Sequence, residues 1–405
     1  MFKNIDGGVT AAHGFRAAGI HCGIRKNKAK RDLALIVSDV PAQAAAVYTK
    51  NRVQGAPIAV TRAHVADGTA CAVIVNSGNA NTCNANGVLV AQKMCEGTAD
   101  ALGLSANDVA VASTGVIGQP LDIAPIAAGL PALVAALTDT GSADAADAIM
   151  TTDTRRKEIA VAFTLGGKTC RLGGIAKGSG MIHPNMATML VFITTDVDIP
   201  ADLLHAALVQ NCESTFHMVS VDGDTSTNDM VLVLANGVAG NAPVQAGTAD
   251  CDTFAAALEY VMRHLSREIA RDGEGATRLL TCKVTGAAST AIARAAAKGV
   301  ICSSLVKAAI FGADANWGRV LCALGYSVPA LDPHTVDVSF ASAAGELCVC
   351  KAGQGVAFNE EIAKKILTED EVIIRVSLGA GIHEAEAWGC DLTYDYVKIN
   401  GDYRT

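Results

Sequence analysis

The residues in the most unusual chemical setting lie between Lys177 and Asp196, in the sequence KGSGMIHPNMATMLVFITTD. The stretch begins rich in glycine, includes Pro184, and ends in the strand-like run MLVFITT. Two small residues, Ala187 and Thr188, stand at the start of that apolar run. Such an arrangement can expose the peptide bond on the amino side of Thr188 to attack by the threonine hydroxyl. Thr188 is therefore a candidate nucleophile.

The chemistry open to Thr188 is self-cleavage followed by acyl transfer. Attack of its Oγ on the carbonyl carbon of Ala187 moves the acyl group from nitrogen to oxygen, and water can hydrolyse the resulting ester. Thr188 then begins a new chain and carries a free α-amine, whose ordinary pKa of roughly 7.7 to 8.0 suits it to act as the base for the hydroxyl. The residues alone leave a second interpretation open, in which Thr188 is an ordinary buried threonine of a strand.

Other motifs with catalytic or metal-binding potential fail on their spacing. Residues 167–169 (GKT) lack the first glycine of a phosphate-binding loop, because Ala162 stands in its place. The acidic loop 222–228 (DGDTSTN) resembles the start of a calcium loop, but it lacks the glycine at position six, and Val233 stands at position twelve instead of glutamate. The histidines form no H-E-x-x-H pair. We therefore expect no metal site.

The elements that must position Thr188 alternate between short β-rich runs and Ala-rich helical runs. Predicted strands are 32–38, 71–76, 109–113, 230–235, 278–285, 335–340, 345–350, 371–377 and 391–398, and a hairpin is predicted at 157–165 and 168–176 around Gly166-Gly167. Predicted helices are 88–103, 122–137, 142–150, 200–210, 253–271, 289–298, 303–310 and 359–367. Mixed strands and helices without a linker between them predict an α/β sandwich whose two halves share a core.

Composition excludes several classes of partner. The chain has 405 residues, of which half are hydrophobic, and its net charge of −8 argues against nucleic acid. No apolar run reaches the length of about 18 to 20 residues that spans a bilayer, and the N-terminus lacks the apolar region of a signal peptide. The 13 cysteines are scattered without C-x-x-C spacing, which indicates reduced thiols in a cytoplasmic protein. We expect no membrane and no nucleic-acid partner.

The segment K-G-S-G-M-I-x-P-N-M-A-T-M-L at 177–190 resembles the signature of the ornithine acetyltransferase family, the glutamate N-acetyltransferases of arginine biosynthesis. Further similar segments are 76–81 (NSGNAN), 113–118 (STGVIG), 150–154 (MTTDT), 272–277 (DGEGAT), 312–319 (GADANWGR) and 396–405 (YVKINGDYRT). The resemblance therefore covers nearly the whole chain in the expected order. It implies a layered αββα-like sandwich that resembles N-terminal-nucleophile hydrolases in layout, with two chains, 1–187 and 188–405, sharing one fold.

The resemblance also implies roles for individual residues. Thr188 matches the nucleophile that becomes acetylated, and Thr114 and Gly115 match the oxyanion hole. The positions that match substrate-binding residues of the family are Thr151, Lys177, Thr188, Glu274, Asn400 and Thr405. Lys177 suits a carboxylate and Glu274 an ammonium group. Without the resemblance, residues 114–115 would be interpreted as a turn after a strand, and the terminal threonine as a frayed end.

The implied reaction is a two-step acetyl transfer from N²-acetyl-L-ornithine to L-glutamate through an acetyl-Thr188 ester. No cofactor is implied, but acetyl-CoA is expected as a second acetyl donor to glutamate, which would make the enzyme bifunctional. The two chains are expected to associate as a heterotetramer of two copies each. Two alternatives stay open: a self-processing aminopeptidase or amidase, in which water accepts the acyl group, and a non-enzymatic amino-acid-binding protein, in which the chain stays uncut.

Overall fold

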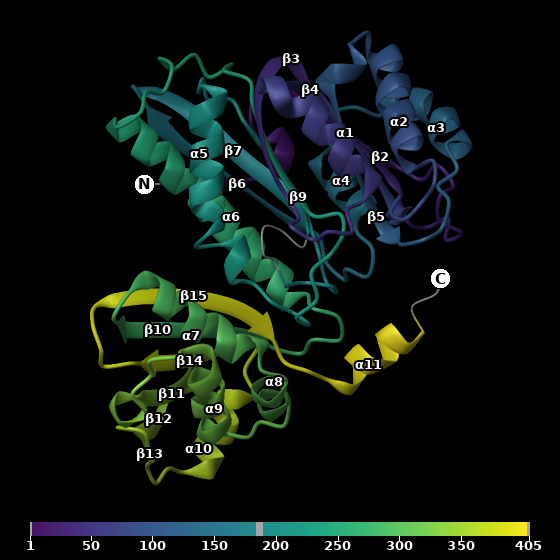
Figure 1. Cartoon of the computed structure of the whole chain (residues 1–405). Helices are drawn as coiled ribbons and strands as arrows, with labels where there is room; N and C mark the ends of the chain where they lie inside the picture. Colours follow the sequence, from purple (N-terminus) through teal and green to yellow (C-terminus); the bar gives the residue numbers. More distant parts are fainter. Residues whose placement is uncertain (1, 184–188, 403–405) are drawn as a thin grey trace. The chain divides into compact units, whose positions relative to one another are not determined.

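The computed structural model describes residues 2–183 and 189–402, so Ala187, Thr188 and Thr405 lie outside the described residues. The chain forms two compact units (Figure 1). Of the described residues, unit 1 contains 2–178, 189–213 and 225–265, and unit 2 contains 179–183, 214–224 and 266–402. Each unit therefore takes residues from both sides of the expected cleavage point.

Within the described residues, unit 1 is built on a nine-stranded sheet. Its strands are β1 (Lys3–Ile5), β2 (Phe15–Ile20), β3 (Leu33–Tyr48), β4 (Thr69–Asn79), β5 (Val109–Val116), β6 (Lys157–Leu165), β7 (Lys168–Lys177), β8 (Leu190–Thr195) and β9 (Met230–Ala235). Their order is β1-β6-β7-β8-β9-β3-β4-β5, and β2 pairs with β3. Strand β8 is antiparallel to β7 and parallel to β9, and β9 is antiparallel to β3. Strands from beyond residue 188 thus lie between strands from before it.

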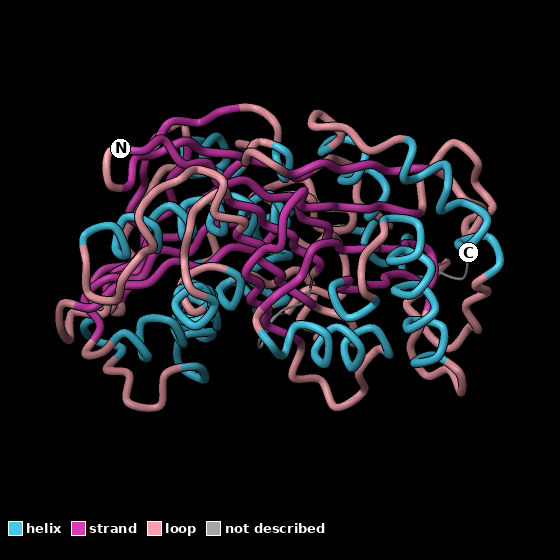
Figure 2. The backbone as a smooth tube through the Cα atoms, turned by 90° about the horizontal axis from the view of Figure 1, so that it is seen from above, coloured by secondary structure: helices cyan, strands magenta, loops and turns pink. Residues whose placement is uncertain are grey.

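The helices of unit 1 are α1 (Ala56–His64), α2 (Gly87–Leu102), α3 (Ala124–Ala135), α4 (Ser142–Ile149), α5 (Ala201–Cys212) and α6 (Ala249–Arg271), of which residues 266–271 belong to unit 2. The short 3-10 helices of the whole chain are Gly8–Thr10, Val65–Asp67, Ala106–Asp108, Phe216–Met218 and Pro333–Thr335. Figure 2 shows the strands in magenta and the helices in cyan. No helix of the described residues has the length and apolar character needed to cross a membrane.

Strand β3 divides the sheet of unit 1 into two layers. Its first half pairs with β2 and β4 and its second half with β9, and the register shifts between Val37 and Ala42. One buried cluster joins the two layers and includes Ile36 and Phe192. A second cluster packs the outer face of β3, β4 and β5 against α2 and α3, and it includes the fully buried Met94. Because α5 packs on the other half of β3, the order is helix, sheet, sheet, helix, and the predicted αββα-like layering is confirmed.

The predicted hairpin around Gly166-Gly167 is also confirmed. Strands β6 and β7 are antiparallel, with Leu165 opposite Lys168. Gly166 has φ of 52° and Gly167 has φ of 78°. Two successive positive φ values are those of the tight hairpin turns that match strand twist, and glycine adopts them without steric cost. This turn fixes the register of β7 and therefore the place where that strand ends, at Lys177.

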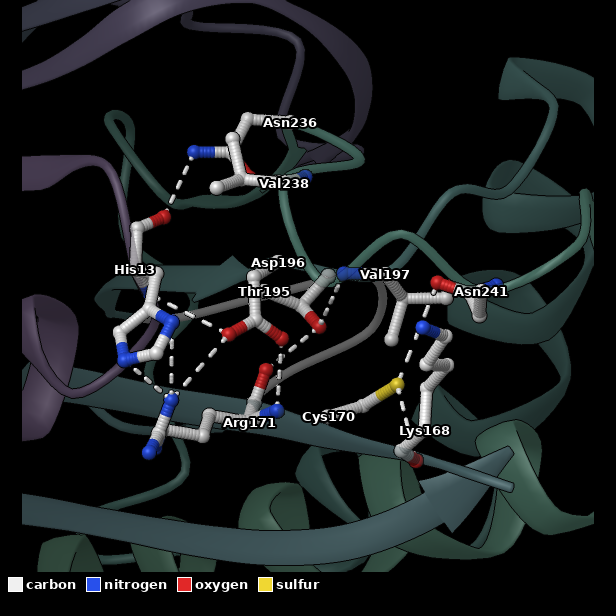
Figure 3. Close-up of polar contacts among 10 residues, drawn as sticks. All are labelled: His13, Lys168, Cys170, Arg171, Thr195, Asp196, Val197, Asn236, Val238 and Asn241. Carbon is white, nitrogen blue, oxygen red and sulfur yellow. Dashed lines mark hydrogen bonds and ion pairs between the residues drawn. The ribbon is translucent and has the colours of Figure 1, made fainter. Parts of the chain in front are cut away.

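A buried carboxylate ties the N-terminal loop to β7 and β8 (Figure 3). Asp196, directly after β8, accepts hydrogen bonds from the backbone N–H of Arg171 at 2.7 Å and of His13 at 3.2 Å. The Thr195 hydroxyl donates to the Arg171 carbonyl at 2.7 Å. Burial raises the pKa of Asp196, while the two N–H donors lower it. These bonds fix the far end of β8, the strand that begins shortly after Thr188 in the sequence.

Unit 2 is built on a six-stranded sheet of the order β13-β12-β11-β14-β10-β15. Its strands are β10 (Leu279–Ala287), β11 (Asp337–Ser342), β12 (Gly345–Lys351), β13 (Gln354–Gly355), β14 (Glu371–Ser377) and β15 (His383–Cys390). Its helices are α7 (Thr290–Cys302), α8 (Ser304–Phe311), α9 (Trp317–Ser327), α10 (Glu360–Leu367) and α11 (Tyr394–Gly401). Leu280, Cys282 and Val284 of β10 are fully buried, whereas Lys283 and Thr285 are more exposed, as expected for a sheet with helices on one face.

The predicted strand at 391–398 is wrong. Strand β15 ends at Cys390, and residues 394–401 form helix α11. The alternation of aromatic and β-branched residues favoured a strand, but the Thr393 hydroxyl accepts a hydrogen bond from the backbone N–H of Tyr396 at 3.4 Å and begins a helix. The same hydroxyl donates to the Gly275 carbonyl at 2.7 Å, which ties the start of α11 to residues 273–277.

Candidate active site

The expected oxyanion residues, Thr114 and Gly115, lie near the end of β5. Thr114 is 9% exposed. Gly115 has φ of 132°, and a Cβ placed on it would lie 2.3 Å from the carbonyl carbon of Gly78 in β4. Because both the conformation and the contact exclude a side chain, only glycine can occupy this position. The two strands therefore approach closely at the place where an oxyanion hole is expected.

An asparagine-rich network supports the end of β5. The Ser113 hydroxyl donates to the Asn76 side-chain oxygen at 2.6 Å, and the Asn76 amide donates to the Asn79 carbonyl at 2.9 Å. From the segment before β9, the Asn228 amide donates to the Ser113 carbonyl at 3.0 Å. All four side chains are buried. Buried polar groups that are mutually bonded fix a backbone precisely, so this network holds the residue before Thr114 in place.

Lys177, at the end of β7, reaches Thr114. Its Nζ donates to the Thr114 Oγ at 3.2 Å, and Lys177 is 8% exposed. Two residues that the sequence placed in the oxyanion hole and in the substrate site therefore meet within unit 1. A buried ammonium group beside a hydroxyl provides a positive charge for a carboxylate or a developing oxyanion.

Asp153 joins the remaining unit 1 candidate, Thr151, to this cluster. Asp153 accepts the backbone N–H of Thr151 at 2.9 Å and that of Gly178 at 2.7 Å. Its carboxylate also forms an ion pair at 2.7 Å with Lys157, and both side chains are fully buried. Burial alone would raise the pKa of Asp153, but the charges of Lys157 and Lys177 hold that pKa well below its usual range. Asp153 is thus ionised and fixes the backbone on either side of the cluster.

The unit 2 candidates Glu274 and Asn400 contact each other. The Asn400 amide, on α11, donates to the Glu274 Oε2 at 2.8 Å. Glu274 is 8% exposed, and its backbone N–H donates to the Ser179 carbonyl at 3.0 Å. A buried carboxylate with an amide partner is suited to bind an ammonium group. The C-terminal segment therefore contributes to the surroundings of Glu274, although Thr405 itself lies outside the described residues.

Asp229, directly before β9, was not singled out from the sequence. It is 2% exposed, and its Oδ2 has no hydrogen-bond partner among the described residues. Burial raises the pKa of Asp229 well above its usual value, although contacts with Ser226 and Thr49 and the charge of Lys177 lower it. The following residue, Met230, donates its backbone N–H to the Met189 carbonyl at 2.9 Å. A buried carboxyl group with a raised pKa therefore lies directly before β9, the strand that pairs with β8.

Replacing Asp229 with asparagine is expected to flatten the dependence of stability on pH. Because the folded state raises the pKa, it binds more protons than the unfolded chain, so stability falls as pH rises above about 4, the unfolded value. The neutral amide has no such titration. The free energy of unfolding of both proteins can be measured with urea at several pH values between 4 and 8. The free energy of unfolding of the variant should rise relative to that of the wild type as pH rises. Parallel curves would show that Asp229 is ionised in the folded protein.

Comparisons with known proteins identify the class and then the family. Arginine biosynthesis bifunctional protein ArgJ of Symbiobacterium thermophilum is 54% identical over 99% of both chains, and ArgJ 1 of Clostridium acetobutylicum is 50% identical over 96% of both. The crystal structure of ArgJ from Bacillus halodurans matches with 46% identity and a TM-score of 0.50, over 52% of this chain and 98% of that one. The protein is thus an acetyltransferase of arginine biosynthesis. The chain belongs to the ArgJ family, whose model matches residues 16–405, and the family resemblance is confirmed.

Proposed function

We propose that this enzyme cuts itself between Ala187 and Thr188 and transfers acetyl from N²-acetyl-L-ornithine to L-glutamate through an ester on Thr188. The observation that carries the proposal is the meeting of Lys177 with Thr114, next to a position that only glycine can occupy. A hydroxyl, a buried cation and a backbone N–H are groups that stabilise the oxyanion of a tetrahedral intermediate. Removing one such donor commonly costs on the order of 3 kcal/mol of transition-state stabilisation.

In the first half-reaction the Thr188 α-amine takes the proton of the threonine hydroxyl. The Oγ attacks the acetyl carbonyl of the substrate, and Thr114 and the Gly115 N–H stabilise the resulting oxyanion. When the intermediate collapses, the substrate nitrogen takes the proton and leaves as the amine of ornithine. The ester is the simplest way to divide an amide-to-amide exchange into two easier steps.

In the second half-reaction glutamate replaces ornithine and its neutral amine attacks the ester carbonyl carbon. The bond from that carbon to Thr188 Oγ breaks, the amine proton passes through the Thr188 α-amine to the departing oxygen, and N-acetylglutamate leaves. The chemistry of the binding residues fits both substrates, because each has an α-carboxylate for a cation such as Lys177. The distal ammonium group of the ornithine substrate suits the buried carboxylate of Glu274. Thr151, Asn400 and Thr405 complete the proposed set of binding residues. No cofactor takes part, and acetyl-CoA serves as a second acetyl donor to glutamate.

The products of cleavage, chains 1–187 and 188–405, remain associated, and two copies of each form a heterotetramer in the cytoplasm. Support for the association comes from unit 1, where β8 and β9 of the second chain pair with β7 and β3 of the first.

The assay that tests the activity is acetyl transfer by the purified protein. With N²-acetyl-L-ornithine and L-glutamate we expect continuous release of ornithine in equal amounts with N-acetylglutamate. Without glutamate, ornithine release should stop near one equivalent per active site, as the acetyl-enzyme accumulates. Continuous ornithine release without glutamate would instead show a hydrolase. A parallel reaction with acetyl-CoA and glutamate tests the second donor.

A further inference from the structure

Residues 179–182, which precede the expected cleavage point, are bonded to two separate segments of unit 2, 221–222 and 272–274. The Ser179 hydroxyl donates to the Asp272 carbonyl at 2.7 Å. The Val221 N–H donates to the Ile182 carbonyl at 2.7 Å. A Cβ on Gly180 would lie 2.3 Å from the Glu274 carboxyl carbon, so this glycine allows the carboxylate to approach the backbone closely. The segment is therefore fixed by the same part of the fold that carries a proposed substrate residue.

The centre of these contacts is Asp222. One carboxylate oxygen accepts the backbone N–H of Met181 at 2.6 Å, and the other accepts that of Ile182 at 2.9 Å. The second oxygen also accepts the N–H of Asp224 at 3.3 Å, and the Tyr396 hydroxyl donates to the first at 3.3 Å. Only a carboxylate can accept two consecutive N–H groups on two oxygens, and its charge makes these bonds shorter and stronger than neutral ones.

The backbone conformation of Met181, which Asp222 holds, is energetically unfavourable by itself. Met181 has φ of 57°, in the left-handed region that residues with a side chain rarely adopt. Such a residue keeps this conformation only where the surroundings impose it, and such residues cluster at functional sites. Two hydrogen bonds from one carboxylate to Met181 and its neighbour Ile182 impose it here.

Helix α11 connects Asp222 to the proposed substrate site. Its Tyr396 bonds Asp222, and one turn further its Asn400 bonds Glu274. Burial and the charge of Asp222 both raise the pKa of the Tyr396 hydroxyl, so the phenol stays a hydrogen-bond donor. Asp222, which holds segment 179–182, and the two proposed substrate residues Glu274 and Asn400 are therefore connected through one helix within unit 2.

We propose that Asp222 is a positioning residue for self-cleavage, which holds the backbone of residues 181 and 182 and so fixes the described end of the segment that leads to the expected cleavage point. The inference rests on the proposed self-cleavage. In that step a bond forms between Thr188 Oγ and the Ala187 carbonyl carbon, the carbon–nitrogen bond breaks, and the hydroxyl proton passes to the nitrogen. Water then hydrolyses the ester to the Ala187 carboxylate and the free hydroxyl. Asp222 acts only through the backbone, by reducing the entropy lost on reaching the reactive geometry.

The test is the rate of cleavage of freshly translated full-length protein, followed by intact mass. Asp222→Asn keeps the shape but loses the charge and one acceptor oxygen, and we expect cleavage to slow at least tenfold. Asp224→Asn removes an acidic charge from the same loop while keeping both backbone bonds, and it should cleave within twofold of the wild-type rate. Asp222→Glu keeps the charge but displaces the oxygens by one methylene, and it should also cleave slowly.

The outcomes separate this proposal from the one on which it rests. If the wild type stays uncut, self-cleavage itself is wrong. If the wild type is cut and folded Asp222→Asn is cut equally fast, only the role of Asp222 is wrong. Far-UV circular dichroism and the urea midpoint establish that each variant is folded. If neither Asp222 variant folds, the residue is structural and the proposal is overturned as well.

Discussion

Thr188→Ala is expected to leave a single uncut chain and to lower kcat/KM for acetyl transfer by at least about 10⁴-fold. The alanine side chain has no oxygen to attack the Ala187 carbonyl in cleavage or the acetyl carbonyl in transfer. Intact mass and the transfer assay measure the two effects on one preparation. Thr188→Ser is the matched control, since serine keeps the hydroxyl and should still be cut and active. An alanine variant that is cut at the same bond, or that keeps activity within tenfold, would place the nucleophile elsewhere.

Lys157→Met is expected to lower the free energy of unfolding by about 3 to 5 kcal/mol, because it leaves the Asp153 charge buried without its closest partner. The neighbouring Arg156 is 38% exposed in its ion pair with Asp147, so Arg156→Met should cost less than about 1 kcal/mol. Urea unfolding measures both variants.

The double variant Lys157→Met with Asp153→Asn tests the cause of this loss. Removing the charge should recover part of the lost stability, since no uncompensated ion then remains buried. A single Lys157→Met variant within about 1 kcal/mol of the wild type would mean that Lys177 and the two backbone N–H donors suffice for Asp153.

Features encoded by neighbouring residues could be predicted from the sequence. The two glycines at 166–167 specify the hairpin because they alone adopt its positive φ values freely. Apolar runs such as 71–76 and 109–113 specify buried strands, and the structure has β4 and β5 there. Of the site, Thr114 and Lys177 were assigned from the family resemblance, and the structure brings them together.

Features that depend on residues far apart in the chain could not be predicted. Nothing around Asp222 indicates that it accepts the N–H groups of residues 181 and 182, and its acidic loop was considered only as a calcium ligand. Asp153 and Lys157 have a spacing that is common on surfaces, and only the folded sheet buries them. Strands β1, β2, β13 and β15 and helices α1 and α9 were not predicted. Helix α11 was interpreted as a strand, because the cap at Thr393 competes with a local pattern that favours strands.

If the chain is cut as proposed, the place of β8 and β9 in the middle of the sheet makes refolding of the cut enzyme harder than folding of the uncut chain. These strands pair with β7 on one side and β3 on the other, so the sheet forms most readily while all of its strands belong to one polypeptide. After the cut, unfolding would release two separate molecules, and reassembly would depend on their concentration and on inserting one pair of strands between two others. The stability of the cut enzyme would thus be kinetic, because it would depend on a slow rate of unfolding and not on refolding.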